Sequence, residues 1–597
     1  MVDFAVLTIC ADEIGNLIAD CSEIEDSSTI SDASFRIASA WLENCLSSHP
    51  KCSAYHNGIP ELPTRVIDVG PSDGSEEPYV YVRKDGQRDR YLTLSHRWGS
   101  STSLEATKTI KANRTLNTTM ILFSSLPLTF QHAIIITRRF GYRYLWIDSL
   151  CIIQDDEDDW MVESEKMGEI YRKADFTIAT IDAMSADSGC FFPRDGQILR
   201  PCRLDIYRPP RQKDTYASHT GKIFASRAVD FGSSRAGYGR TSSLDSRGWC
   251  LQERVLSTRT LSYSKYGLFW ECVTTEATEM VPYGIDEDGT DEAYEYMRHL
   301  RKQIGAIALT SRYGKERPDT HNAWHLLVQD YSRRNLTKES DKLIALKGII
   351  NSLNDAKDDI CYAGIWKKHL WRDLSWLVVT QTTVIKLTHK GLNIPSGGRK
   401  GRRLASSIAP TWSWASVEGH VCFLIDGLYS TLSDISFGQE LPKSFGPVIT
   451  ATGSLVKVRT CSCSATCDPD YVKKEKKDMI HYFLEDKIEH LLDADTKKRV
   501  ADWYPDDGNA SHALAWCLPI GEYLSNAICL TLIPVDSFGA NHYQRIGLAV
   551  WSSGDWKASC ASRTSILQGI PEQAPPHRYF MRASDDGTEL VRKIYIV

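Results

Sequence analysis

Strand-like and helix-like patterns alternate between about residues 91 and 182, and this alternation restricts the fold more than any other feature. Short β-prone apolar runs at 91–95, 144–148 and 175–182 are separated by amphipathic helical patterns at 127–141 and 160–174. The first of these helical patterns starts with a proline and ends near a glycine, as helices often do. Strands that alternate with helices predict an α/β fold with a largely parallel sheet covered on both faces.

The α/β pattern has recognisable neighbours on both sides. An amphipathic helix is predicted at 34–48, a short helix at 248–256, and strands at 259–264 and 268–272. A polar hairpin with Asp85-Gly86 as its turn is predicted to lead into the strand at 91–95. A chain of 597 residues is too long for one core. We therefore expect four regions: a helical and extended lead-in (1–87), the α/β domain (88–277, with an insertion near 185–246), a mainly helical region (278–395) and a mixed α+β region (404–597).

The net charge and the cysteine content indicate which partners and which cellular compartment to expect. The formal net charge of −6 gives no reason to expect nucleic acid or an anionic membrane as a partner. The seventeen cysteines are scattered, which favours reduced thiols in a cytoplasmic setting. No run approaches the roughly 18 apolar residues of a membrane span, and the N-terminus does not resemble a secretory signal.

Polar and aromatic residues follow two of the predicted parallel strands at the point where each strand ends. Ser95 and Asp148 stand at the carboxyl ends, and His96, Arg97 and Trp98 begin the loop after the first strand. Ligands bind at this edge in open α/β sheets, so we predict a substrate site there. The alternative is that Asp148 caps the following turn and Trp98 packs in the core.

The segment Arg247–Ser257 adds a carboxylate to this candidate site. In a helix, Trp249 and Glu253 are four residues apart and share a face. An aromatic plane beside an acid can stack a flat heterocycle, and a carboxylate stabilises the oxocarbenium-like state of glycoside cleavage. The alternative is a buried tryptophan and a glutamate paired with Arg247, Arg254 or Arg259.

Two clusters of cysteines contain side chains that could bind a metal ion. Cys45, His49 and Cys52 form a C-x3-H-x2-C pattern, but no fourth ligand has a convincing spacing, so ordinary thiols at a helix end are favoured. The C-x-C-x3-C pattern of Cys461, Cys463 and Cys467 lacks a fourth ligand in the same way. No metal site is therefore predicted.

The three segments YLTLSHRWG (91–99), LWIDSLCIIQ (145–154) and RGWCLQERVLS (247–257), in this order, resemble the HET (heterokaryon incompatibility) domain of filamentous fungi. The resemblance covers about residues 91–272. It implies a cytoplasmic effector of non-self recognition coupled to programmed cell death. The family usually shows Cys where this chain has Arg97, so the resemblance gives no support to thiol chemistry at that position.

HET domains have been likened to TIR domains, which have flavodoxin-like sheets, and some TIR domains cleave NAD with a helical glutamate. The string around Glu253 is similar to the TIR pattern S-x-W-C-x-x-E in its Trp, Cys and Glu. This second resemblance implies Glu253 as the catalytic acid, with Glu165 and Glu169 as competitors. It implies NAD as a substrate and no bound cofactor. The alternative that it leaves open is a non-catalytic module that acts by self-association or through an unidentified protein partner.

Overall fold

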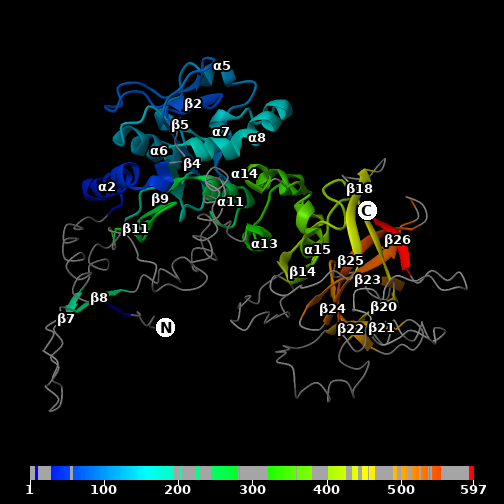
Figure 1. Cartoon of the computed structure of the whole chain (residues 1–597). Coiled ribbons are helices and arrows are strands. Elements are labelled where there is room, and N and C mark those ends of the chain that lie inside the picture. The colour runs from blue at the N-terminus through cyan, green and yellow to red at the C-terminus, as the bar shows by residue number, and fades with distance from the viewer. Residues whose placement is uncertain are drawn as a thin grey trace, which may run out of the picture. The chain divides into compact units, whose positions relative to one another are not determined.

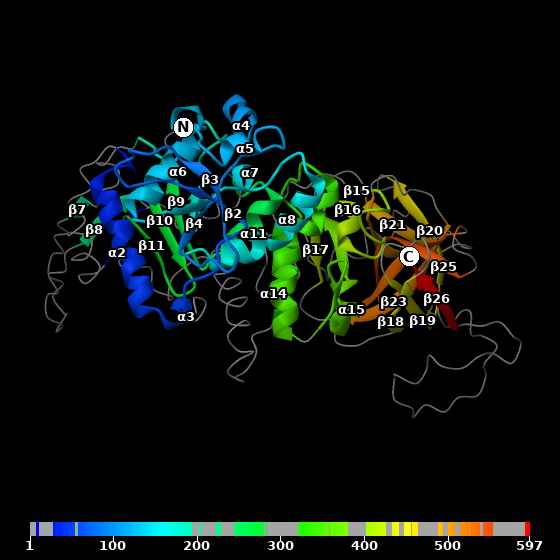
Figure 2. The same cartoon turned by 90° about the horizontal axis from the view of Figure 1, so that it is seen from above.

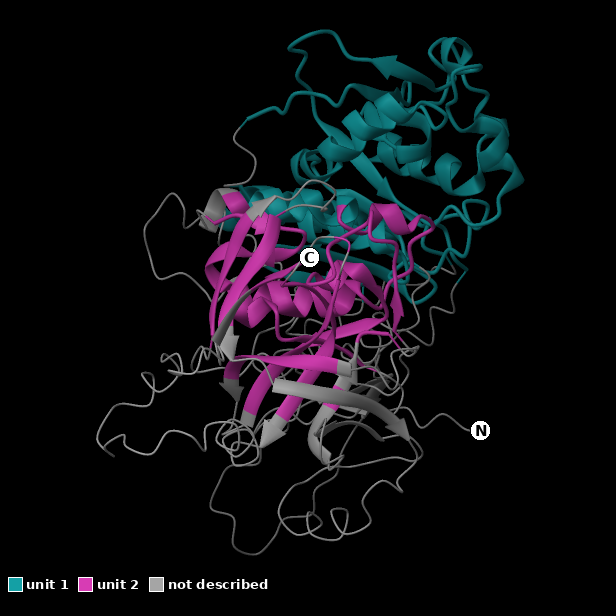
Figure 3. Ribbon diagram, turned by 90° about the vertical axis from the view of Figure 1, so that its right-hand side faces the viewer, with its two compact units in different colours: residues 1–318, 344–353 teal, residues 319–343, 354–597 magenta. Residues whose placement is uncertain are grey.

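The computed structural model describes the chain over the following residues: 7–10, 28–53, 58–193, 202–204, 223–227, 244–279, 282, 320–357, 359–379, 401–424, 433–440, 447–454, 456–463, 488–493, 499–507, 514–523, 526–535, 537, 541–552 and 591–597. The chain divides into two compact units, which Figure 3 colours separately. Unit 1 comprises residues 1–318 and 344–353, and unit 2 comprises residues 319–343 and 354–597. Within the described residues, no helix is both long enough and apolar enough to span a membrane.

An eight-stranded mixed sheet organises unit 1, in the order β11-β10-β9-β6-β4-β5-β2-β3 (Figure 1). Its four central strands β5, β4, β6 and β9 run parallel to one another. Numbered along the chain, these four strands have the spatial order 2-1-3-4. The bounds are β2 Arg65–Asp68, β3 Tyr79–Val82, β4 Tyr91–Ser95, β5 Tyr144–Trp146, β6 Thr177–Thr180, β9 Arg259–Ser264, β10 Gly267–Cys272 and β11 Glu276–Thr278.

The α/β class predicted from the alternation is confirmed, and the sheet is mixed because antiparallel strands flank the parallel centre on both sides. On one side β10 pairs with β9 and β11, and on the other β2 pairs with β5 and β3. The predicted hairpin into the strand at 91–95 is wrong. Gly86 does lie in a turn with a φ of +69°, but β3 pairs with β2, and β4 is a central strand between β5 and β6. All five residues of β4 are buried, so the apolar run is explained by burial on both faces.

Four helices of unit 1 lie where the sequence predicts them, namely α2 Asp32–Ser48, α6 Leu128–Arg139, α8 Glu157–Lys173 and α11 Gly248–Leu256. Helix α2 begins after Ser31, whose side chain accepts a hydrogen bond from the Ser34 N–H. Its buried face includes Ala38, Trp41, Leu42 and Cys45, and the helix packs against β10 (Figure 2). The helices are α2 Asp32–Ser48, α3 Pro50–Ser53, α4 Thr102–Thr107, α5 Arg114–Asn117, α6 Leu128–Arg139, α7 Asp148–Cys151, α8 Glu157–Lys173, α11 Gly248–Leu256 and α14 Lys347–Lys357.

A small antiparallel sheet, β1-β8-β7, completes the described strands of unit 1. It joins β1 Leu7–Cys10 to β7 Cys202–Leu204 and β8 Ile223–Arg227. The last two strands belong to the insertion predicted near 185–246, most of which lies outside the described residues.

Unit 2 is built around a nine-stranded, mainly antiparallel sheet in the order β18-β19-β26-β25-β22-β21-β20-β23-β24. Helices α13 Thr320–Tyr331 and α15 Leu370–Asp373 and the pair β14 Trp376–Val379 and β17 His420–Phe423 precede it. The sheet strands are β18 Asp434–Glu440, β19 Pro447–Ser454, β20 Val456–Cys463, β21 Ile488–Asp493, β22 Arg499–Pro505, β23 Leu514–Tyr523, β24 Asn526–Pro534, β25 His542–Ser552 and β26 Val591–Ile596. Residues 283–319 and 380–395 of the region predicted to be mainly helical lie outside the described residues.

Candidate functional site

The predicted site forms where the carboxyl end of β4 meets α11. Ser95 is the last residue of β4, and its hydroxyl donates a hydrogen bond of 2.5 Å to the Glu253 carboxylate. Each residue is 4% exposed. Helix α11 begins after Arg247, and Glu253 falls on its buried face because Cys250 and Leu251 pack inward on the same side. The structure therefore brings together Ser95 and Glu253, two residues that are 158 positions apart.

Burial raises the pKa of the Glu253 carboxyl to about 7. The positive charge of Arg247 and the hydrogen bond from Ser95 oppose this shift, but desolvation of the carboxylate is the larger effect. At neutral pH both the acid and the carboxylate are therefore populated. A group in this condition can give or take a proton near neutrality, as a general acid or base must.

His96 lies beside this pair but is held neutral. It is 3% exposed, and burial lowers its pKa to about 4 even though the Asp148 charge acts in the other direction. Its Nδ1 is 3.9 Å from the Asp148 carboxylate, and its ring meets Phe130 edge-on at 4.9 Å. Within the described part of the chain, His96 Nε2 is buried and has no hydrogen-bond partner. A neutral imidazole with one unsatisfied nitrogen can still accept or donate one hydrogen bond.

The side chains of Asp148 and Trp98 are hydrogen-bonded to each other. Both lie at the predicted site, and both also make contacts of the kind expected in the alternative, where Asp148 stabilises the following turn and Trp98 packs in the core. The Trp98 indole N–H donates to the Asp148 carboxylate at 2.9 Å, and the other oxygen accepts the Ser149 N–H at 2.7 Å. Asp148 thus anchors the first turn of α7, and the half-buried Trp98 packs against the core. These contacts join the loop after β4 to the loop after β5.

The arginines and Trp249 complete the set of predicted residues. Arg247 donates to the His96 carbonyl oxygen at 2.7 Å, so it ties the start of α11 to the loop after β4. Arg97 is half-buried in the same loop. Trp249 meets Trp160 of α8 edge-on at 6.2 Å, on a half-buried part of α11. Its role as a stacking surface for a heterocycle stays a prediction.

A small pocket opens beside Ser95 on the sheet. Its polar lining includes Arg254, which pairs with Asp245 at 3.3 Å and with Glu271 at 3.2 Å. Arg254 was one of the partners suggested for Glu253, and its actual partners Asp245 and Glu271 were not predicted. The sequence does contain an indication for Glu271, because it is the single charged residue in the apolar strand GLFWEC and a buried charge needs a partner. The competitors Glu165 and Glu169 are half or more exposed on α8, where they pair with Lys347 and Lys173.

Two clusters of metal-ligating side chains lie elsewhere in the described chain. Cys45, His49, Cys52 and Cys272 form one in unit 1. In unit 2, His321 and His325 of α13 both contact one oxygen of Asp373, at 3.0 and 2.7 Å. Burial alone would raise the pKa of Asp373, but the two histidines hold it below its ordinary value. The contact between His325 Nε2 and Asp373 is a hydrogen bond, and His321 Nε2 approaches the same carboxylate oxygen. Both separations are shorter than the roughly 3.3 Å expected between two ligands of one tetrahedral ion.

The fold and the site define an α/β domain with a buried acid at the carboxyl edge of its parallel strands. Residues 91–253 match the sequence model of a family described as Heterokaryon incompatibility protein (HET). The matched segment begins with β4 and ends at Glu253 in α11, so it contains both members of the buried pair. No curated protein and no solved structure matches the chain.

Proposed function

We propose that this chain is an effector of heterokaryon incompatibility in which the HET domain couples non-self recognition to cell death by cleaving NAD. The family match over residues 91–253 supports the incompatibility role. The observation that carries the chemical part is the buried Ser95–Glu253 pair, because its carboxyl has a pKa of about 7. The spatial order 2-1-3-4 of the parallel strands, which flavodoxin-like folds share, also supports a ligand site at the end of β4.

The proposed reaction breaks the bond between nicotinamide and ribose and adds water, so that NAD and water give nicotinamide, ADP-ribose and a proton. Glu253 as a carboxylate would stabilise the positive charge that develops on the ribose. Ser95 would orient that carboxylate. His96 Nε2, Asp148 and Trp98 would contact the substrate from the adjoining loops, and Trp249 would offer a stacking surface.

Because Glu253 is buried, the proposed mechanism requires a conformational change before the substrate can bind. A carboxylate that is 4% exposed does not meet a dinucleotide until the loops after β4 and β5 move. The Trp98–Asp148 hydrogen bond joins these two loops, and the Arg247–His96 hydrogen bond joins the first of them to α11, so both bonds must change before the substrate enters. The resting protein would then be inactive, as a cell-death effector has to be before recognition.

The experiment is nicotinamide release from NAD by the purified full-length chain at high protein concentration. We expect turnover that Glu253→Gln abolishes, in parallel with loss of toxicity in cells. Glu163→Gln is the matched control, because Glu163 is 2% exposed in the same domain but pairs with Lys166 on α8. Glu169→Gln tests the competing acid. Turnover that survives Glu253→Gln would contradict the assignment.

A second function is a non-catalytic module that signals by self-association. Three large apolar side chains within seven residues favour it, since Leu116, Met120 and Leu122 are 63%, 43% and 53% exposed. In this case Glu253→Gln would leave toxicity intact, and the folded full-length protein would form oligomers without consuming NAD.

A further inference from the structure

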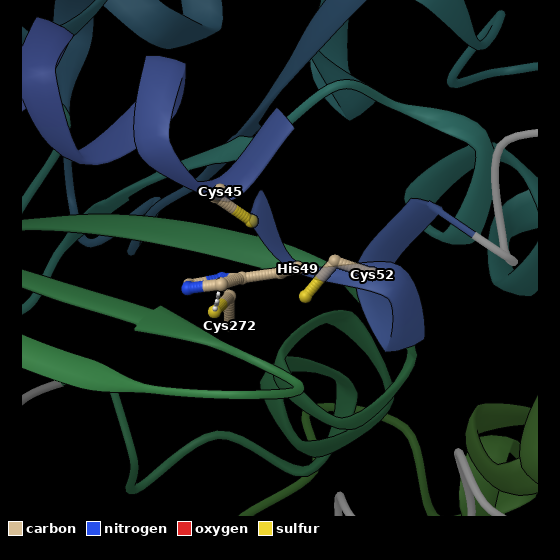
Figure 4. A group of neighbouring side chains, drawn as sticks. All are labelled: Cys45, His49, Cys52 and Cys272. Atoms are coloured by element: carbon tan, nitrogen blue, oxygen red, sulfur yellow. Dashed lines mark hydrogen bonds between the residues drawn. The ribbon is translucent and has the colours of Figure 1, made fainter. Parts of the chain in front are cut away.

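Four side chains with metal-binding atoms converge at the point where α2 and α3 meet the end of β10. Figure 4 shows Cys45, His49, Cys52 and Cys272 directed toward one another. Their ligand atoms all lie within 4.8 Å of one another. The three cysteines are almost fully buried, at 0%, 0% and 7% exposure, and His49 is half-buried.

Local structure explains how three of these residues meet. Cys45 lies one helical turn before His49, which caps α2, so both side chains are on the same side of the helix end. Pro50 then starts the short helix α3, which returns Cys52 to the same position. The fourth residue, Cys272, ends β10 and is 223 positions from His49. That distance along the chain is why the C-x3-H-x2-C pattern seemed to lack a fourth ligand.

The spacing suits a tetrahedral ion. Zinc bonds of about 2.3 Å to sulfur and about 2.0 Å to nitrogen place a sulfur and a nitrogen about 3.5 Å apart and two sulfurs about 3.8 Å apart. The Cys272 Sγ to His49 Nδ1 distance is 3.5 Å. The remaining separations, at most 4.8 Å, close to these values with small side-chain rotations.

Polar groups lie beside all three sulfur atoms. Arg259, which is 1% exposed, directs its Nε to Cys45 Sγ at 3.1 Å. The Thr275 N–H donates to Cys272 Sγ at 3.2 Å, and the Thr274 hydroxyl lies 3.4 Å from Cys52 Sγ. Each sulfur therefore has a polar group beside it, as the ligands of metal sites do. Arg259 also donates to the Asp175 carbonyl oxygen at 3.1 Å. Three thiolates, one Zn²⁺ and one guanidinium would sum to zero charge, so the loaded site would add no net charge to the interior.

We propose that Cys45, His49, Cys52 and Cys272 bind one Zn²⁺ ion in a closed structural site. Four protein ligands of the Cys3His type leave no open coordination position for a substrate, so the ion would have a structural role and not a catalytic one. It joins α2 and α3 to the sheet of unit 1 at β10. This site is separate from the Ser95–Glu253 pair and does not depend on the proposed enzymatic reaction.

The first test needs no variant. The full-length protein, purified without chelator and analysed by plasma mass spectrometry, is expected to contain one zinc per chain. Replacing zinc with Co²⁺ should give the visible absorption of a tetrahedral ion together with thiolate-to-cobalt charge transfer. A folded protein that holds no zinc after dialysis against zinc chloride, one that holds iron, or one with a disulfide between two of these cysteines would overturn the proposal.

Variants then assign the ligands. Cys272→Ser should lose the zinc, and His49→Cys should keep it, because four cysteines also bind zinc. Cys190→Ser is the matched control, since Cys190 is equally buried in the same unit and lies outside the cluster. Zinc retained in full by Cys272→Ser would contradict the assignment. If that variant does not fold, the zinc content and cobalt spectrum of the unmodified protein decide.

Discussion

The raised pKa of Glu253 makes the free energy of unfolding depend on pH. Its folded-state pKa of about 7 exceeds the value of 4.5 that it would have in an unfolded chain. The folded state therefore holds this proton more tightly, so protonation of Glu253 favours folding below pH 4.5. That contribution is lost as the pH rises through 7.

Glu253→Gln removes this dependence, and its effect on stability should consequently change with pH. Relative to the unmodified protein, the variant should gain up to about 3 kcal/mol in the free energy of unfolding between pH 4.5 and pH 8. Melting temperatures of both proteins, measured at pH 5 and pH 8, check this. A difference between them that stays constant across that range would show that Glu253 has an ordinary pKa.

Arg545 in unit 2 makes a prediction about a buried charge. It is fully buried, lies over the Trp376 ring and pairs with Asp506, also fully buried, at 3.0 Å. It donates to the Leu374 and Trp376 carbonyl oxygens, and burial lowers its pKa to about 10. Arg545→Met should destabilise unit 2 by about 3 kcal/mol, because the two carbonyl oxygens lose their donor and Asp506 keeps only its pair with Arg403 at 2.9 Å.

Chemical denaturation of the full-length protein measures the effect of Arg545→Met. Arg402→Met is the control, since Arg402 pairs with Glu339 and Glu418 at the exposed surface and should matter little. Equal losses of stability in both variants would refute the argument from burial.

For single residues, the sequence predicted correctly those whose location follows directly from their position in a strand or helix. Ser95 and Glu253 are examples, since the end of a strand and the face of a helix can be read from local patterns. Partners cannot be read in this way. Arg254 pairs with Asp245 and Glu271 rather than with its neighbour along the chain, and Arg259 reaches a sulfur, because these choices depend on how distant segments pack.

Among the elements, α8 and α14 approach each other through two glycines. A Cβ at Gly168 would lie 2.8 Å from the Gly348 Cα and 2.9 Å from Leu256. One at Gly348 would lie 2.8 Å from the Gln252 side-chain oxygen, which accepts the Gly348 N–H. This contact explains why residues 344–353 belong to unit 1 although unit 2 surrounds them in the sequence.

Gly168→Ala should therefore destabilise the protein despite the higher helix propensity of alanine. We expect a loss of about 1–3 kcal/mol from overpacking, visible as a lower melting temperature. Met161→Ala on the same helix is the control, because Met161 is 56% exposed. A melting temperature that rises in Gly168→Ala would mean that the helices separate at no cost.

Elements with strong local patterns were predicted well, and those that depend on distant pairing were not. The strands at 91–95 and 259–264 and the helix at 248–256 occur with the predicted bounds. The Lys/Glu-rich stretch around 471–499 has a helical pattern, yet its described part, Ile488–Asp493, is strand β21 between β20 and β22. Pairing on both sides outweighs a weak helical preference there.

For the molecule as a whole, the sequence predicted an α/β domain followed by a mixed region but not the sheet order. Alternating patterns show that strands are parallel, whereas the places of β10, β11, β2 and β3 depend on antiparallel partners that local patterns do not specify. The two compact units also interleave in sequence, since residues 344–353 return to unit 1. No composition shift marks that return.

The family match ends at residue 253, but the sheet continues beyond it. Strand β9 follows the match in sequence and pairs with every residue of β6. A fragment cut at residues 91–253 would leave the backbone of β6 without a neighbour on that side, as a bare apolar edge open to other chains. We expect that fragment to aggregate on expression and the full-length chain to remain dispersed, as size-exclusion chromatography with light scattering would show. Toxicity or inactivity observed with the shorter piece would then describe misassembled protein rather than the domain.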